Sequence, residues 1–401
     1  MTSTIELTDS RVMPTYRRKP VEFVRGQGMY LFDNEGKRFL DFVAGVAVTA
    51  LGHAHPQISE AMSKQSAELV HTSNLYYTRP MAELAMRLTD LLGWSDGRVF
   101  FANSGAEANE CAMKLVRRWA KERFGPDRYE LIAALGSFHG RTFETLAATG
   151  QPAKWEPFSP LPPGFRHVPF DDAAALEAAV DDSVSGVLLE PILGEGGVVV
   201  PKDDYLPTVR RICDDNGLAL IMDEVQTGLG RTGRMFAFER QGAVPDVITL
   251  AKALGNGLPI GACAARGELA GAFSPGDHGT TMGGGPVVCS VALTVLDVIE
   301  KESLVENAAQ VGSHLRAGLE ELKRNHTVIS EIRGLGLLLG IDLEQEVAAQ
   351  VVSAAFEEGL LVNDVTPRVI RLCPPLIVSE SECDAAVETL DRVFSAVEGQ
   401  M

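Results

Sequence analysis

Short apolar segments alternate with helical stretches between about residues 61 and 305, and no other feature of the chain limits the possible folds as strongly. Each segment ends in polar or glycine-rich residues. A strand that helices cover on both faces needs such a continuous apolar run. We therefore expect an α/β fold with a doubly wound, mostly parallel sheet. The expected strands are RVFFAN (98–103), YELIAAL (129–135), SGVLLEPI (185–192), LALIMDEV (218–225) and DVITL (246–250).

The length of 401 residues suggests two or three domains. We expect a large domain over residues 61–305 and a smaller C-terminal α/β domain over residues 306–401. The N-terminal segment, residues 1–60, should pack with the smaller domain. It contains an expected strand pair around the turn NEGK (34–37), whose third residue is glycine, a good hairpin signal. Further helices are expected near 304–324, 345–357 and 380–397.

Composition excludes several classes of partner. The chain has 36 basic and 54 acidic residues, a net charge of -18, so nucleic acid is not expected to bind. The six cysteines form no C-x-x-C pair, which favours reduced thiols. The N-terminus lacks the apolar stretch of a signal peptide, and no apolar run approaches the ~20 residues that cross a bilayer. We expect a soluble cytoplasmic protein with no membrane partner. His53 and His55 alone do not make a metal site, so no metal is expected.

Lys252 stands at an unusual place, between the expected strand DVITL (246–250) and the glycine-rich loop GNG (255–257). Lysine is almost never fully buried unless it is paired or has reacted. One interpretation is that its stem lies on the core and its ammonium reaches water. The other is that it has a covalent role.

The segment NSGAEANE (103–110) resembles a helix start. Ser104 with Glu107 three residues later predicts a capping box. Gly105 and Ala106 would then leave backbone N–H groups free at the positive end of the helix, which suits a phosphate. A well-capped structural helix is the alternative.

Two other strand ends carry polar side chains. Asp223 and Glu224 follow a strongly apolar run, and adjacent strand residues point to opposite faces, so only one of them should face a site. A buried carboxylate there needs a positive partner. After another strand, Arg141 offers a planar fork for a carboxylate. His139 could be a catalytic base, although a lone histidine is more often structural.

These strand ends would bring together a lysine, a buried acid, the aromatic ring of Phe138, an arginine and a phosphate site. Ligands of α/β sheets bind outside the carboxyl ends of the strands. Pyridoxal 5'-phosphate needs a lysine to hold it, an acid to keep its ring nitrogen protonated and an anion site for its phosphate. The set therefore favours this cofactor.

The sequence resembles a known family, the class III (ornithine-type) aminotransferases. It is most similar to members that act on acetylornithine. The motifs DEVQTGLGRTG (223–233) and TLAKALGNGLPIGA (249–262) are highly specific to this class, and the similarity covers nearly the whole chain. The resemblance implies a type I pyridoxal-phosphate-dependent transferase fold, with a large domain and a smaller α/β domain. It also implies a homodimer whose active sites lie at the subunit interface.

The resemblance assigns roles to individual residues. Lys252 would tether the cofactor covalently and then act as a proton shuttle, and Asp223 would pair with the ring nitrogen. Phe138 would stack on the ring, and Thr281 would reach the phosphate in the neighbouring subunit. The remaining residues that the resemblance implies for cofactor binding are Gly105, Ala106, Glu224, Val225 and Gln226.

Substrate recognition would use two arginines. Arg141 would bind the α-carboxylate of acetylornithine, and Arg371 the α-carboxylate of glutamate or 2-oxoglutarate. Glu195 would neutralise Arg371 while the amino donor is bound. Thr280 and Tyr16 would also contact the substrate.

The chain departs from the family pattern at Met282, Gly285 and Thr49, which puts fine specificity in doubt more than the reaction type. Val46 stands where ornithine aminotransferases carry tyrosine, which favours an acylated substrate. The implied reaction moves the δ-amino group of N2-acetylornithine to 2-oxoglutarate, giving N-acetylglutamate 5-semialdehyde and glutamate, a step of arginine biosynthesis.

Other amino donors remain open, namely succinylornithine, ornithine, 4-aminobutyrate and N-succinyl-2-amino-6-oxopimelate. A pyridoxal-phosphate aminomutase and a non-catalytic binding protein are the alternatives from other classes.

Overall fold

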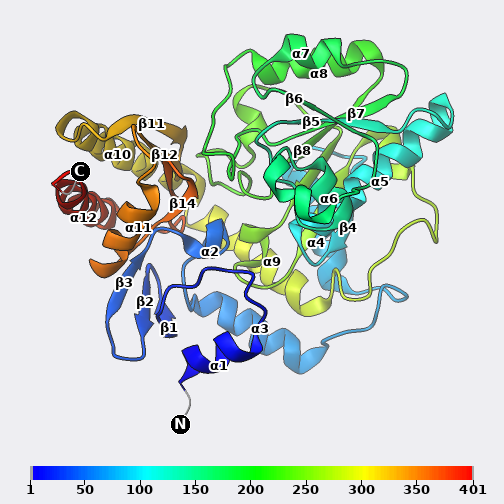
Figure 1. Ribbon diagram of the computed structural model, residues 1–401. Helices are drawn as coiled ribbons and strands as arrows, with labels where there is room; N and C mark the ends of the chain where they lie inside the picture. The colour runs from blue at the N-terminus through cyan, green and yellow to red at the C-terminus, as the bar shows by residue number, and fades with distance from the viewer. Residues whose placement is uncertain (1–2, 400–401) are drawn as a thin grey trace.

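The computed structural model describes residues 3–399 and is built around a seven-stranded sheet (Figure 1). All five apolar runs form strands of this sheet, as expected. One strand, β10, runs antiparallel to both of its neighbours, while the five strands from β9 to β6 are parallel. In spatial order the strands are β4 (Arg98–Ala102), β10 (Gly261–Ala265), β9 (Val247–Leu250), β8 (Ala219–Asp223), β7 (Val184–Leu189), β5 (Glu130–Ala134) and β6 (Phe165–Val168).

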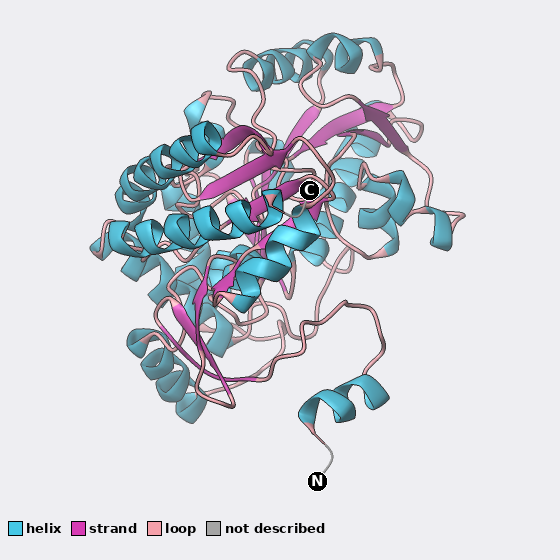
Figure 2. Ribbon diagram, turned by 60° about the vertical axis from the view of Figure 1, so that its left-hand side comes forward, coloured by secondary structure: helices cyan, strands magenta, loops and turns pink. Residues whose placement is uncertain are grey.

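Helices cover both faces of the sheet, which explains the continuous apolar runs (Figure 2). In β8, Ile221 packs in the cluster that contains α5 (Gly105–Phe124). Its neighbour Met222 packs in the cluster that contains α8 (Tyr205–Asn216) and α9 (Pro286–Lys301). Because side chains alternate along a strand, Asp223 continues the face toward α5.

Sequence reasoning missed β6 and β10. The β10 segment GACAA consists of small residues with low strand propensity, and β6 carries Arg166 and His167. Small residues are required in β10 because the sheet passes close to the start of α5. A Cβ on Gly261 would lie 2.2 Å from the carbonyl oxygen of Ser104.

The C-terminal part forms a separate four-stranded antiparallel sheet (Figure 1). Its strands, in order, are β11 (Ile329–Leu335), β12 (Leu338–Leu343), β15 (Val369–Leu372) and β14 (Asn363–Thr366). The three expected helices are present as α10 (Leu304–Asn325), α11 (Ala348–Glu357) and α12 (Glu380–Glu398). Strand β15 carries Arg371, whose side chain is fully buried.

The N-terminal strands β1 (Phe23–Gln27), β2 (Tyr30–Asp33) and β3 (Arg38–Asp41) form an antiparallel sheet, and the expected hairpin lies between β2 and β3. Gly36 in its turn has a φ of +87°, which glycine adopts without strain. β3 also pairs in parallel with β13 (Leu360–Leu361). This pairing is the basis on which we propose that residues 1–60 pack with residues 306–401; the domain boundaries themselves remain predictions.

The segment after β3 is strained. Ala44, Gly45, Val46 and Ala47 all have a φ between +51° and +69°, the left-handed region, which is costly for valine. Asp41 stabilises the start of this segment, since its carboxylate accepts hydrogen bonds from the N–H groups of Val43 and Ala44, both at 2.9 Å.

The remaining α-helices are α1 (Thr4–Arg11), α2 (Ala44–Ala47), α3 (Pro56–Glu68), α4 (Arg79–Leu91), α6 (Phe143–Ala148) and α7 (Ala173–Ala178). Within residues 3–399, none of the helices combines the length and the apolar character needed to cross a bilayer.

Candidate active site

A cavity of about 480 Å³ lies at the carboxyl ends of the parallel strands, beside the start of α5. This is where α/β sheets bind ligands. Segments that are far apart in the sequence contribute to its walls. The residues predicted from sequence that line it are Gly105, Ala106, Phe138, Arg141, Glu195, Asp223, Val225, Gln226 and Lys252.

Lys252 follows β9 and lines this cavity. Its backbone has a φ of +41°, a conformation that residues other than glycine rarely adopt, and such strain gathers at functional sites. Burial lowers the pKa of the Lys252 ammonium, and Arg371 lowers it further, while Glu195 and Asp223 oppose this. Lys252 thus lies in the cavity with a weakened hold on its proton.

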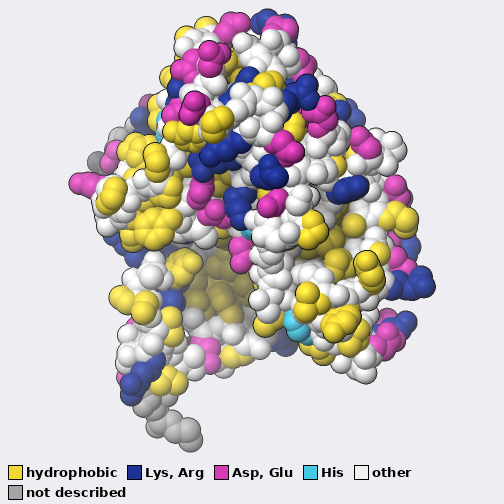
Figure 3. All heavy atoms as spheres, turned by 90° about the vertical axis from the view of Figure 1, so that its right-hand side faces the viewer, with side chains coloured by type: hydrophobic (Ala, Val, Ile, Leu, Met, Phe, Trp, Pro, Cys, Tyr) yellow, Lys and Arg dark blue, Asp and Glu magenta, His cyan; other side chains and the backbone are white. Residues whose placement is uncertain are grey.

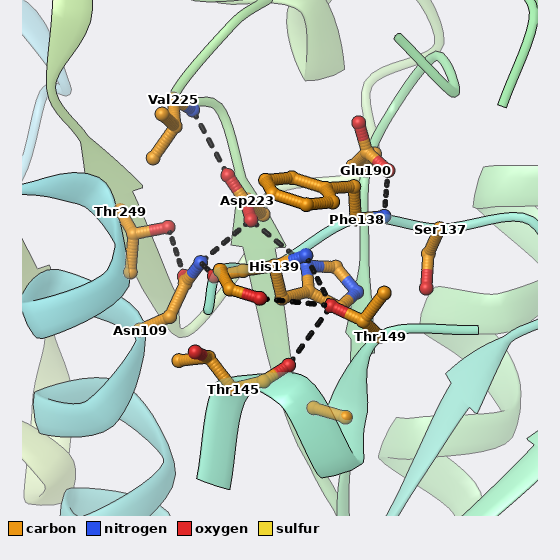
Figure 4. A network of polar contacts seen from close by, with 12 residues as sticks. Asn109, Ser137, Phe138, His139, Thr145, Thr149, Glu190, Asp223, Val225 and Thr249 are labelled. Atoms are coloured by element: carbon orange, nitrogen blue, oxygen red, sulfur yellow. Dashed lines mark hydrogen bonds and ion pairs between the residues drawn. The ribbon is translucent and has the colours of Figure 1, made fainter. Parts of the chain in front are cut away.

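The carboxylate of Asp223 is buried and fixed by three donors (Figure 4). Asn109 Nδ2 donates to Asp223 Oδ2 at 2.7 Å, and His139 Nδ1 lies 2.8 Å from the same oxygen. The N–H of Val225 donates to Oδ1 at 3.0 Å. Asn109 is itself oriented by the Thr249 hydroxyl, which donates to Asn109 Oδ1 at 2.7 Å. The acid therefore has one defined orientation in the cavity wall.

The position of His139 bears on its two interpretations. The side chain is buried, and one ring nitrogen is bound to Asp223. This arrangement orients Asp223 and favours the structural interpretation over a catalytic base. Asn109 was missed because a polar residue within a helical pattern is typically on the solvent side; here it lies on the face of α5 that packs on the sheet.

Glu224 extends to the other face of β8, as the alternation predicts. Its carboxylate accepts hydrogen bonds from the Thr227 hydroxyl and from the N–H groups of Ala237 and Phe238, each at 2.9 Å. Burial raises the pKa of Glu224 to about 7. The structure thus places Glu224 outside the cavity lining, and its contact with the cofactor remains a prediction.

The backbone at the start of α5 packs closely against the residues that follow β8. A Cβ on Gly105 would lie 2.7 Å from Val225 Cγ1, so only glycine fits without displacement. The Ser104 hydroxyl accepts a hydrogen bond from the N–H of Glu107 at 3.2 Å, as expected for the N-cap. The reciprocal half of the expected capping box differs, because the Glu107 carboxylate accepts from Asn103 N–H at 2.5 Å rather than from Ser104 N–H. The cap holds the helix start in place beside the cavity.

Phe138 and its surroundings form another wall. The guanidinium of Arg141 lies 5.5 Å from the Phe138 ring centroid. Lys154, which sequence reasoning missed, places its ammonium 5.9 Å from the same ring. Burial and the nearby Arg141 lower the pKa of Lys154. Two basic side chains thus lie within 6 Å of the centre of this ring.

Arg371 reaches toward the cavity from β15 and is paired with Glu195. Arg371 Nη1 donates to Glu195 Oε1 at 2.5 Å and to Gln226 Oε1 at 3.0 Å. Burial alone would raise the pKa of Glu195, but Arg371 and Lys252 outweigh it and lower the pKa. The pair is therefore an ion pair in this structure, with a fully buried arginine.

Tyr16, Thr280 and Thr281 do not line the cavity of a single chain. Tyr16 is 75% exposed. Thr280 lies at the rim, where its hydroxyl accepts a hydrogen bond from Asn103 Nδ2 at 3.3 Å. Thr281 is exposed on the chain surface. The roles of these residues remain predictions.

Residues 12–394 match the family model described as aminotransferase class-III. The chain belongs to the class III aminotransferases. It is a transaminase whose cofactor is pyridoxal 5'-phosphate. The cavity fits this cofactor, because it joins a lysine with a lowered pKa, an oriented buried acid and a helix start at which a Cβ would clash.

Individual relatives are similar over nearly the whole chain. The acetylornithine aminotransferase of Caldanaerobacter subterraneus subsp. tengcongensis is 48% identical over 96% of this chain and 98% of its own. That of Gloeobacter violaceus is 50% identical over 96% of both. Among solved structures, the ornithine aminotransferase of Toxoplasma gondii ME49 superimposes with a TM-score of 0.95 at 33% identity, covering 99% of this chain and 95% of that one. The acetylornithine aminotransferase of Elizabethkingia anophelis gives a TM-score of 0.87 at 33% identity, with 98% of each chain covered.

Gly105→Ala should weaken cofactor binding. The added methyl group would displace Val225 or the helix start, and overpacking of this kind costs about 1–3 kcal/mol, so the dissociation constant should rise about 10–100-fold. Absorbance titration of the apoenzyme with pyridoxal phosphate measures it. Gly271→Ala is the matched control, because a Cβ there meets nothing within 4 Å. Equal affinity of the Gly105→Ala variant and the wild type would contradict a role of this helix start in phosphate binding.

Proposed function

We propose that this aminotransferase moves the δ-amino group of N2-acetylornithine to 2-oxoglutarate, giving N-acetylglutamate 5-semialdehyde and glutamate, as a step of arginine biosynthesis. The observation that carries the proposal is the ion pair of Arg371 with Glu195 beside Lys252 and Asp223. With Glu195 on Arg371 the two charges cancel, and with Glu195 moved aside Arg371 would present a free positive charge to the cavity. The similarity to proteins named acetylornithine aminotransferase supports the choice of amino donor.

When bound, pyridoxal phosphate accepts the amino group and withdraws electrons from the carbon that loses a proton. Lys252 Nζ would hold the cofactor and then, as a free amine, take up that proton and return it. Burial suits this role, since it lowers the pKa of the ammonium. Asp223, held by Asn109 and His139, would keep the ring nitrogen protonated. Gly105 and Ala106 would bind the phosphate through backbone N–H groups at the start of α5.

Arg141 and Arg371 would divide the recognition of the two substrates. Acetylornithine brings one carboxylate, which Arg141 at the cavity wall would bind. While it is bound, Glu195 covers the charge of Arg371. 2-Oxoglutarate brings two carboxylates, and Glu195 would move aside so that Arg371 binds the second one in a planar two-point contact.

Two observations bear on the alternatives. Val46 lies in the strained left-handed segment, and Val48, just beyond it, places one apolar side chain in the cavity lining. The absence of a tyrosine at position 46 is the feature that favours an acylated donor. An aminomutase moves an amino group within one molecule and has no need of a switch for 2-oxoglutarate. The buried Arg371–Glu195 pair therefore favours a transaminase over an aminomutase.

A panel of amino donors tests the substrate assignment. With 2-oxoglutarate as acceptor, we expect glutamate formation with the highest kcat/KM for acetylornithine. The comparison compounds are succinylornithine, ornithine, 4-aminobutyrate and N-succinyl-2-amino-6-oxopimelate. A higher kcat/KM for any of these would replace acetylornithine as the donor, since specificity is a difference in transition-state binding.

Arg371→Lys should damage one half-reaction selectively. Lysine cannot reproduce the two-point contact, so reaction with glutamate or 2-oxoglutarate should slow about 10–100-fold, the scale of hydrogen bonds to charged groups. Reaction with acetylornithine should change much less. Stopped-flow absorbance of the separate half-reactions measures both rates.

Arg141→Lys is the control for that experiment. Arg141 would hold a carboxylate of each substrate, so its replacement should slow both half-reactions. Equal losses in both halves for Arg371→Lys would contradict the switch and leave the transaminase assignment intact.

We also propose that the active unit is a homodimer. An apolar face is exposed where residues 69–77 lie beside residues 280–285, joined by hydrogen bonds from Asn74 Nδ2 to the carbonyl oxygens of Thr280 at 3.2 Å and Gly283 at 3.0 Å. Figure 3 shows hydrophobic side chains clustered on this side of the molecule. Exposed apolar patches of this kind mark protein interfaces. The exposed side chains include Val70, Leu75, Tyr76, Tyr77 and Met282.

A second copy on this face would bring its Thr281 toward the first copy's cavity and would complete a site that one chain leaves open. Sedimentation of the holoenzyme as a single chain would contradict the dimer.

We also propose a cytoplasmic location. The six cysteines are all free and buried, which supports it.

A further inference from the structure

Glu190 is a buried carboxyl group in the cavity wall to which the proposed mechanism gives no role. It follows β7, and its two oxygens bind two different loops. Oε2 accepts a hydrogen bond from the N–H of Phe138 at 2.9 Å, and Oε1 accepts one from the N–H of Gly194 at 3.1 Å (Figure 4 shows the first). One loop carries the ring of Phe138, and the other carries Glu195.

The loop that carries Gly194 and Glu195 is tightly packed. A Cβ on Gly194 would lie 2.1 Å from Gln226 Oε1, so the backbone at Gly194 is in close contact with the side chain that binds Arg371. A shift of Gly194 would therefore move Glu195 and press on Gln226. The hydrogen bond from Gly194 to Glu190 fixes this position.

We propose that Glu190 is a positioning residue that sets the Phe138 ring and the Glu195 carboxylate relative to each other through one carboxyl group. The proposal rests on the function proposed above for Glu195 and on the expectation from the sequence that Phe138 stacks on the cofactor ring. Glutamate is suited to the task because both of its oxygens accept hydrogen bonds when it is ionised. Glutamine would direct an NH₂ group at one of the two N–H donors.

The charge of Glu190 makes this positioning depend on pH. Burial raises the pKa of Glu190 to about 7, and Asp223 raises it as well, while His139 and the two N–H groups oppose this. Lys252, after β9, and Arg371, on β15, also face it. The ionised form accepts strongly at both oxygens, whereas in the protonated form one oxygen is an O–H group and a weaker acceptor. The geometry should therefore be complete above about pH 7 and weaken below it.

The stability of the fold should depend on pH in the opposite direction to the positioning by Glu190. The folded pKa lies above the unfolded value near 4.5, so the native state binds the extra proton between these values and the fold loses stability as pH rises from 4.5 toward 7. Ionised Glu190 is thus maintained at a cost to the fold.

The test uses Glu190→Gln holoenzyme, without any amino donor, so that its result does not depend on the substrate assignment. In the wild type, infrared difference spectra should show protonated carboxyl groups that ionise near pH 7, from Glu190 and from the similarly buried Glu224. The Glu190→Gln variant should lose one of these two signals. Its visible circular dichroism, which reports how the cofactor ring is held, should change at pH 8 and lose its variation around pH 7.

Asp246→Asn is the control. Asp246 accepts a hydrogen bond from the N–H of Leu220 at 2.9 Å and lies at the other end of β9 from the cavity. Its loss should lower the melting temperature but leave the two infrared carboxyl signals and the visible dichroism as in the wild type. If Glu190→Gln does not fold, Glu190→Asp keeps both oxygens and should retain the infrared signal with an altered dichroism. Unchanged dichroism in the Glu190 variants, or the same change in Asp246→Asn, would overturn the proposal.

Discussion

The structure depends on one costly arrangement, a carboxylate buried at the end of the central strand β8. Asp223 is 3% exposed and lies where the apolar core meets the cavity. A buried charge is tolerated only when it is paired and hydrogen-bonded. Asn109 from α5, His139 from the loop after β5 and the backbone of Val225 supply these contacts. Three separate elements are therefore tied to one side chain, and together they fix the orientation of its carboxylate in the cavity wall.

The other charged groups follow the same rule. Glu195 and Arg371 form an ion pair. Under the proposed function, this pair would cover a binding site for a carboxylate until 2-oxoglutarate or glutamate enters. Lys252 is surrounded by both signs of charge, but burial dominates and lowers its pKa. Each of these charged groups would be costly to bury alone. The parallel strands hold them together at one edge of the sheet, where they compensate one another.

The sequence predicted those parts of the fold and site that arise from local pattern. Continuous apolar runs predicted β8 and β9, and the alternation along β8 predicted that Asp223 and Glu224 face opposite sides. Features that depend on close approach were missed. The residues of β10 are small because α5 begins beside them, and the reach of Asn109 and Glu190 into the site depends on how separate segments pack. Tyr16 and Thr281 are exposed on one chain, and their predicted roles involve the open side of the cavity or a second copy.

Covalent trapping tests most directly whether Lys252 is the residue that holds the cofactor. Borohydride reduction of the holoenzyme would make the bond between Lys252 Nζ and the cofactor permanent, and mass spectrometry of the peptides would then locate it. We predict a mass increment of one reduced cofactor on the peptide that carries Lys252 and none in the Lys252→Ala variant. The same increment on a different lysine peptide, with the Lys252 peptide unmodified, would contradict the account.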